Sequence, residues 1–293
     1  MRKYVSISLF CLICFADFLT AQNQPSLLIR CDDIGMNHSV NMAIEQVLQT
    51  GMPVSASVMF ACPWYQEAVA ILKKYDNASV GIHLTLNAEW KFYRWGPVAG
   101  INKVPSLVDS LGYFYPTRAS LFAARPSPAE VEIELRAQIE RAVNSGVKID
   151  YLDYHMGAAV QTEELRQIVE KLADEYQLGI AQYFGEKYSS VTYRAAIDAK
   201  TDSLVERVEN LQPGEMSLQV IHIGLDTPEM RTLIDVNEFG PKDMSKQRAG
   251  ELAALLSDDF QRALKKKQVR LVTYRDLIKE IGLKQMSRPV FTY

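Results

Sequence analysis

The feature that most constrains the fold of this chain is a regular alternation of short apolar runs with longer amphipathic segments. The apolar runs have the length of buried strands, which are predicted at 26–31, 54–60, 79–86, 147–153, 179–183, 217–223 and 268–273. Helical periodicity separates them; residues 37–50, for example, gather aliphatic side chains on one face and stop at Gly51. Strands separated by helices pair in parallel, and the helices cover the sheet. The pattern therefore predicts an α/β fold: a (β/α) barrel-like domain, distorted or incomplete, with about seven parallel strands.

The amino-terminal residues predict export. Arg2 and Lys3 precede an apolar stretch over 5–19, and Ala21 supplies a small residue at a plausible cleavage point. This is the pattern of a signal peptide, although an uncleaved anchor is the alternative. We predict a signal peptide at 1–21, one domain over 22–293, a periplasmic or secreted location, and no stable membrane insertion after cleavage.

Charge and cysteine usage narrow the partners and the covalent chemistry. The net charge is −3, and the absence of a basic stripe argues against a nucleic-acid partner. Lys265–Lys267 fits a solvated helix end. Cys31 and Cys62 remain in the mature chain, and two buried free thiols are favoured over the disulfide that export would permit.

Two segments stand out from the strand–helix rhythm. A helix is predicted to open at Pro128, with Ser127 as its cap and Glu130 completing a capping box. Residues 87–125 form a long loop that is rich in aromatic side chains, which argues against disorder. Trp90 and Trp95 in this loop could either pack it or stack on a sugar ring.

Polar side chains stand at the ends of several predicted strands. They are Asp32 and Asp33 after the first strand, His83 in the third, and His155 and His222 after two later strands. The carboxyl ends of parallel barrel strands converge on the active-site face. We therefore expect these residues, which are distant in sequence, to meet at one end of the barrel.

Their chemistry fits a metal-dependent hydrolase. Two imidazoles and one carboxylate leave a divalent ion an open position for water, and the ion acidifies that water and polarises a carbonyl. A second carboxylate takes the proton from the water, and an acid protonates the leaving group. Adjacent aspartates at a strand end point in different directions, so one can bind metal while the other faces the water. A turn-forming role for the paired aspartates and structural roles for the histidines remain alternatives; for His38, at the start of the first helix, a surface or structural role is favoured.

Several motifs, taken in order, resemble those of the YdjC-like carbohydrate deacetylases, which are relatives of the polysaccharide deacetylases. The motifs are Arg30-Cys-Asp-Asp-Ile-Gly-Met36 with Val40-Asn-Met-Ala-Ile44, Gly81-Ile-His-Leu-Thr-Leu86, Tyr151-Leu-Asp-Tyr-His155, and weaker versions at Val220-Ile-His222 and Arg248-Ala-Gly-Glu-Leu252. The similarity runs from about Leu27 to Leu277. It implies a barrel-like β/α fold and hydrolysis of an N-acetyl group on a sugar.

The resemblance also implies roles for individual residues. Asp32 would be the general base, and Asp33, His83 and His155 would be the ligands of one divalent ion. Zinc is the favoured ion, with magnesium or cobalt as alternatives. His222 would be the general acid or an oxyanion stabiliser. The chain is thus interpreted as a hydrolase that acts on a small acetylated saccharide.

Two other functions remain open. One is a metal-dependent hydrolase of a different amide or ester, and the other is an inactive carbohydrate-binding protein of the same fold. Trp90, Trp95 and Arg248 are the candidate substrate-binding residues.

Overall fold

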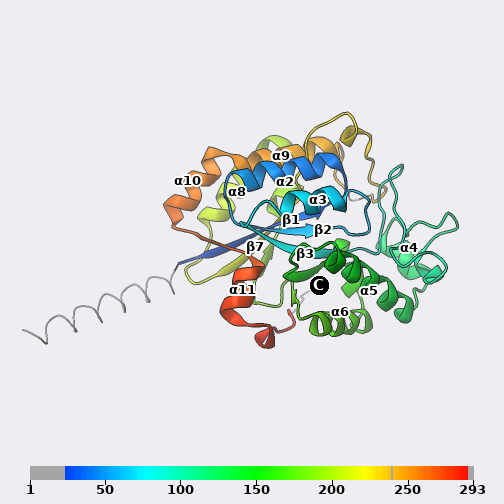
Figure 1. Ribbon diagram of the computed structural model, residues 1–293. Helices are drawn as coiled ribbons and strands as arrows, with labels where there is room; N and C mark the ends of the chain where they lie inside the picture. The colour runs from blue at the N-terminus through cyan, green and yellow to red at the C-terminus, as the bar shows by residue number, and fades with distance from the viewer. Residues whose placement is uncertain (1–23, 239, 290–293) are drawn as a thin grey trace, which may run out of the picture.

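The computed structural model describes residues 24–238 and 240–289, and within them eight strands form one curled, wholly parallel sheet (Figure 1). The strand order is β5-β4-β3-β2-β1-β7-β6, and β8 pairs with the start of β1. The strands are β1 Ser26–Ile34, β2 Val54–Val58, β3 Ala78–Leu84, β4 Tyr151–Tyr154, β5 Gly179–Ile180, β6 Lys187–Ser189, β7 Met216–Ile221 and β8 Arg270–Val272. Since β5 and β6 end this order, the described sheet is an incomplete barrel. The predicted barrel-like α/β fold is confirmed.

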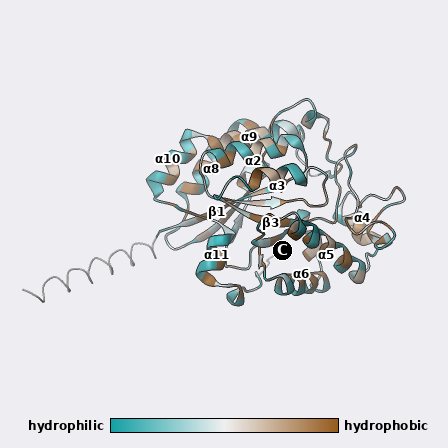
Figure 2. Ribbon diagram, in the orientation of Figure 1, coloured by the Kyte–Doolittle hydropathy of each residue, from teal (hydrophilic) through white to brown (hydrophobic). Residues whose placement is uncertain are grey.

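Helices cover the sheet on both sides. They are α2 His38–Gln49, α3 Tyr65–Leu72, α4 Arg118–Ala123, α5 Pro128–Asn144, α6 Glu163–Tyr176, α7 Val191–Arg194, α8 Lys200–Glu209, α9 Met244–Leu256, α10 Asp258–Lys267 and α11 Tyr274–Ile281. In Figure 1, α2, α3, α8 and α9 lie above the strands, and α5, α6 and α11 lie below. Figure 2 shows hydrophobic and hydrophilic residues alternating along these helices, as expected when one face of each is buried.

Strand β1 lies at the centre of the sheet, between β7 and β2, and all nine of its residues are buried. Leu27, Leu28 and Ile29 form an apolar run near its start, as is typical of a parallel strand covered on both faces. Arg30, Asp32 and Asp33 are also buried in this strand. Buried charges are tolerated when they are paired or bind a metal. The three buried charged side chains therefore mark the centre of the sheet as a candidate functional site.

Helix α11 closes the amino-terminal end of the barrel interior. The ring of Tyr274 packs on that of Tyr151, with centroids 4.2 Å apart, and the Tyr274 amide donates to the hydroxyl of Ser55 near the start of β2. Gly81 leaves room for this packing, because a Cβ atom there would lie 2.3 Å from the Tyr151 ring. With this end filled, the carboxyl ends of the strands remain for chemistry.

One local prediction is wrong, and one strand was missed. Helix α5 begins at Pro128 as expected, but Ser127 makes no side-chain cap and Glu130 instead accepts from the amide of Ser106. The predicted capping box is therefore absent, because the Glu130 carboxylate binds the backbone of a distant segment rather than that of Ser127. Strand β6 was not predicted, since its residues Lys187–Ser189 are few, polar and mostly exposed.

The predicted signal peptide at 1–21 lies outside the described residues. Within 24–238 and 240–289, no helix combines the length and the apolar character that crossing a membrane requires.

Candidate metal centre

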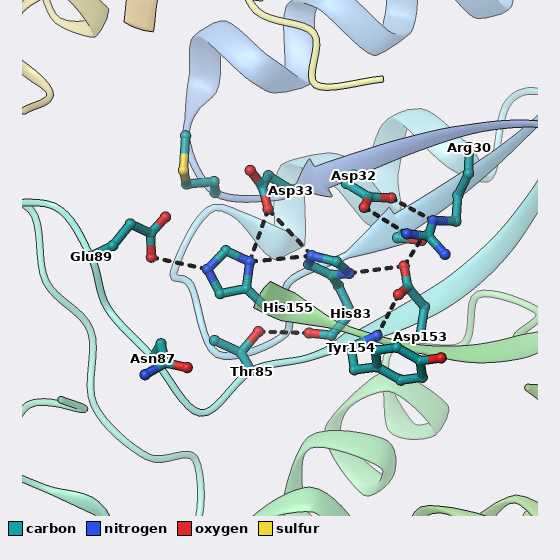
Figure 3. A network of polar contacts seen from close by, with 12 residues as sticks. Arg30, Asp32, Asp33, His83, Thr85, Asn87, Glu89, Asp153, Tyr154 and His155 are labelled. Atoms are coloured by element: carbon teal, nitrogen blue, oxygen red, sulfur yellow. Dashed lines mark hydrogen bonds and ion pairs between the residues drawn. The ribbon is translucent and has the colours of Figure 1, made fainter. Parts of the chain in front are cut away.

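A bulge in β1 separates the two neighbouring aspartates. Asp33 has a φ of +63°, and the pairing of β1 with β2 shifts register between Cys31 and Ile34. Bulges re-aim side chains in this way beside active sites. In Figure 3, Asp32 faces Arg30, whereas Asp33 faces the two histidines. The expectation that the adjacent carboxylates point in different directions is confirmed.

Three side chains meet at the carboxyl ends of β1, β3 and β4. The Oδ1 atom of Asp33 lies 3.4 Å from Nε2 of His83 and 3.2 Å from Nδ1 of His155. The two nitrogens are 3.2 Å apart. The expected convergence of strand ends therefore brings together Asp33, His83 and His155, all of which are buried.

The spacing of these atoms fits one small divalent ion. Zinc lies ~2.0–2.2 Å from such nitrogen and oxygen ligands, and tetrahedral angles then separate the ligand atoms by about 3.3–3.6 Å. One observed separation, 3.4 Å, lies within this range, and the other two, both 3.2 Å, lie just below it. Hence the three atoms can reach a common ion with little movement.

In each imidazole, the outer nitrogen, which faces away from the triangle, contacts a carboxylate. Nδ1 of His83 is 2.9 Å from Oδ2 of Asp153, and Nε2 of His155 is 2.9 Å from Oε2 of Glu89 (Figure 3). In the neutral imidazole the outer nitrogen donates to its carboxylate, so the inner nitrogen presents a lone pair. Three lone-pair atoms then face one another, an arrangement that a cation stabilises.

The charge balance points the same way. Burial opposes the charged form of His83, but the carboxylates of Asp153 and Asp32 raise its pKa to about 9. Burial likewise opposes the charged form of His155, yet Glu89 and Asp33 raise its pKa well above the usual value. The surrounding carboxylates thus favour positive charge at the centre, which a divalent ion would supply.

Arg248 of α9 holds the outer oxygen of Asp33. Its Nη2 lies 2.5 Å from Oδ2, and both side chains are almost fully buried. Burial alone would raise the pKa of Asp33, but Arg248 and the two histidines hold it well below the usual range. At Oδ1, no donor among the described residues is aligned for a hydrogen bond. Asp33 therefore offers an ionised, free oxygen to the centre.

Asp32 belongs to a neighbouring ion-pair network. Arg30 donates from Nε and Nη2 to the two oxygens of Asp32, at 2.7 and 2.8 Å, and its Nε is also 3.1 Å from Asp153. Asp32, His83 and Asp153 lie close enough together to suggest a second ion. The guanidinium of Arg30 already supplies the cation between these aspartates, so we assign no metal there.

His222 directly follows β7, beside the site strand. Ile221 pairs with Cys31, which precedes Asp32, so His222 and Asp32 continue neighbouring strands in register. The His222 amide donates to Glu251 of α9, and its ring lies 5.1 Å from that of Tyr193. Its Nδ1 is buried and has no hydrogen-bond partner among the described residues. His222 therefore lies at the carboxyl ends of the strands, as expected. Its role as the general acid remains a prediction.

The two tryptophans of the long loop are packing residues in this structure. Trp90 is 1% exposed and donates to the sulfur of Met36; Trp95 is 4% exposed and donates to the carbonyl of Asn87. Neither indole face is open for stacking on a sugar, so the packing interpretation is favoured over direct substrate contact. Arg248, the third candidate for substrate binding, instead pairs with Asp33.

Sequence reasoning assigned no role to four residues of this region. Arg30 and Asp153 each stand two residues before a site residue: Asp32 lies on the same strand as Arg30, and His155 directly follows the strand that holds Asp153. Period-two alternation along the strands could have found both. Glu89 and Glu251 lie outside the strands, and their partners follow only from tertiary structure.

The remaining predicted residues lie apart from the centre. Cys31 and Cys62 are buried free thiols, which is the state that the sequence favoured over a disulfide. His38 is a surface residue that pairs with Glu67, as expected. Lys265–Lys267 ends α10, with Lys265 and Lys266 exposed.

Two surface cavities lie elsewhere in the fold. One, of about 400 Å³, runs along α5, and the other, of about 310 Å³, lies between α6 and residues 283–288. Neither is lined by Asp33, His83 or His155. The chemistry of the side chains, rather than the size of a cavity, therefore locates the site.

Comparison with known proteins gives relatives over most of the chain. The family model described as YdjC-like protein matches residues 26–266. A carbohydrate deacetylase of Brevibacillus brevis is 28% identical over 264 residues, covering 86% of this chain and 99% of the relative. A carbohydrate deacetylase of Geobacillus stearothermophilus is 26% identical over 266 residues, covering 86% and 98%.

Solved structures of similar fold include an Enterococcus faecalis protein described as a cellobiose-phosphate cleavage protein, with a TM-score of 0.71 and 21% identity. The match covers 87% of this chain and 99% of that one. At this identity the likeness shows the fold alone.

Proposed function

Because the chain belongs to the YdjC-like protein family, we propose that it is a metal-dependent carbohydrate deacetylase that removes N-acetyl groups from a small acetylated saccharide. The observation that carries this proposal is the triangle of Asp33 Oδ1, His83 Nε2 and His155 Nδ1. Two imidazoles and a carboxylate are the ligand set of a catalytic zinc site that keeps a position open. Zinc is the proposed ion, with magnesium and cobalt as alternatives. The names of the two bacterial relatives support the substrate class.

Asp32 is the proposed general base. When bound, the ion acidifies a water molecule and polarises the substrate carbonyl. The Asp32 carboxylate accepts the proton that the attacking water loses. Arg30 keeps this carboxylate in one orientation through two hydrogen bonds, and the oxygens retain further lone pairs for the proton.

His222 is the proposed general acid. Hydrolysis of an acetamide releases acetate and an amine, and the amine leaves readily only when its nitrogen is protonated. Imidazole is the side chain best matched to give that proton near neutral pH. The partly exposed position of His222 after β7, in register with Asp32, supports this role.

We also propose that the protein is exported, with residues 1–21 as a cleaved signal peptide. The basic start and the apolar stretch over 5–19 support this proposal. Expression of the full chain followed by amino-terminal sequencing of the product tests it. A mature product that begins near residue 22 outside the cytoplasm is expected, and an intact cytoplasmic product would contradict it.

Acetate release from N-acetylated oligosaccharides tests the function. Protein stripped of metal is compared with the same protein after addition of zinc, magnesium or cobalt, and with His83→Ala. We expect acetate from at least one saccharide only with metal and with His83 intact. Acetate esters and N-acetylated peptides are assayed beside the saccharides, and acetate from these alone would indicate a different hydrolase. Saccharide binding without any release would indicate an inactive binding protein.

A further inference from the structure

Glu89 lies in the long aromatic segment, outside every strand that forms the metal centre. Its side chain is buried, with 4% of the residue exposed, and Oε2 is 2.9 Å from Nε2 of His155. On the other side of the same ring, Nδ1 faces Asp33 and His83. We propose that Glu89 is a positioning residue that fixes His155 with Nδ1 toward the ion. This inference rests on the metal site of the proposed function.

The argument begins with the tautomer of His155. A ring that binds an ion through Nδ1 must carry its proton on Nε2, where a buried N–H needs an acceptor. Glu89 is that acceptor. The ring of Trp95 lies edge-on to His155 at 6.3 Å and limits its rotation. Together, Glu89 and Trp95 define both the proton position and the orientation of the ring.

Glu89 is itself fixed by backbone pairing between two distant segments, 89–91 and 234–236, which we call the collar. The Val236 amide donates to the carbonyl of Glu89, and the Lys91 amide donates to the carbonyl of Ile234. Trp90 and Asp235 form an antiparallel bridge between them. The collar therefore places the Glu89 side chain without help from the sheet.

The collar also reaches a second ligand through Arg248. The guanidinium of Arg248 lies over the Trp90 ring at 5.7 Å, and the same guanidinium holds Asp33. Neighbouring residues of the collar thus contact His155 directly and Asp33 through one intermediary. The outer support of the centre comes from loops as well as from strands.

Metal binding by Glu89→Ala and Glu89→Gln tests the proposal, with Glu67→Ala as the matched control. Glu67 makes the same kind of contact, 2.8 Å from a ring nitrogen of His38, but at the surface. The dissociation constant for zinc is measured by competition with a coloured chelator. The visible spectrum of the cobalt-loaded protein reports the ligand geometry, and circular dichroism checks that each variant is folded.

We expect Glu89→Ala to weaken zinc binding by about 10–100-fold and to change the cobalt spectrum. Glu89→Gln, which keeps an acceptor but loses the charge, should restore part of the affinity and most of the spectrum. Glu67→Ala should match the parent protein in both measurements. Should Glu89→Ala fail to fold, Glu89→Met, which keeps most of the side-chain volume but has no oxygen acceptor, takes its place, and a zinc affinity and cobalt spectrum equal to the parent's would then overturn the proposal.

Parent-like zinc affinity and an unchanged cobalt spectrum in Glu89→Ala would also overturn it. A parent protein that binds neither zinc nor cobalt would overturn this inference and the metal site together. A parent that binds zinc but releases no acetate would contradict the proposed function alone. The two failures are therefore distinguishable.

Discussion

The guanidinium of Arg248 binds the outer oxygen of Asp33, while the inner oxygen of Asp33 faces His83 and His155. The two oxygens of the Asp33 carboxylate therefore have different roles. One oxygen is fixed by α9, and the other is left for an ion. The arrangement explains how an ionised aspartate remains at the buried centre of a parallel sheet.

Arg248→Met should destabilise the metal-free protein by ~3–5 kcal/mol, because removing one partner of a buried ion pair leaves the other charge uncompensated. Urea unfolding of the stripped protein measures the change in unfolding free energy. Arg231→Met is the control, since Arg231 makes a two-point contact with Asp226 at the surface. Its loss should have a much smaller effect. Equal effects of the two variants would show that the Arg248 contact carries no special weight.

Asp32→Asn should keep the ion and lose turnover. The amide has nearly the same shape as the carboxylate, but it cannot take the water's proton, a role worth ~10²–10⁴-fold in rate. Metal content and acetate release are measured on the same samples. Parallel loss of metal and activity would instead make Asp32 a ligand or a structural residue.

His222→Ala should lower kcat for an N-acetyl sugar and have much less effect on an activated acetate ester. The reason is that the ester's leaving group departs without a proton, whereas the amine needs one. Zinc affinity should stay close to that of the parent, since no described contact joins His222 to the three ligands. Similar losses on both substrates would remove His222 from the acid role.

The affinity for zinc should fall as the pH is lowered below about 9. In the metal-free protein, burial opposes protonation of His83, yet Asp153 and Asp32 raise its pKa to about 9. A protonated imidazole must lose its proton before it binds the ion, so acid favours the metal-free form. The apparent association constant should drop about tenfold per pH unit for each proton released. Calorimetry in buffers of different ionisation enthalpy counts these protons, and pH-independent binding would contradict the charge balance described here.

Much of the fold could be predicted because its signals are local. Apolar runs of strand length, separated by helical periodicity, predict a parallel sheet, and the polar residues at their ends predict where chemistry lies. This rule pointed to Asp32, Asp33, His83, His155 and His222, and the family resemblance implied which of them are ligands. The structure brings the three implied ligands, Asp33, His83 and His155, together at the carboxyl ends of β1, β3 and β4. The parallel strands place these residues side by side although they are far apart in the sequence.

The outer support of the site could not be predicted in the same way. Arg248 lies 215 residues from Asp33, and Glu89 lies in an irregular loop, so no periodicity relates either residue to its partner. The sequence also cannot tell whether a loop aromatic packs inward or faces substrate. In the structure Trp90 and Trp95 are buried, and Met36 and Asn87 accept hydrogen bonds from their indole nitrogens.

The proposed zinc site is tested by an anomalous diffraction map, measured above the zinc absorption edge on crystals of the zinc-loaded protein. We expect one strong peak ~2.0–2.2 Å from Asp33 Oδ1, His83 Nε2 and His155 Nδ1, with Arg248, Asp153 and Glu89 still at the outer atoms of these ligands. A peak between Asp32 and Asp153, or no peak near these residues at full zinc occupancy in solution, would contradict a zinc site formed by Asp33, His83 and His155.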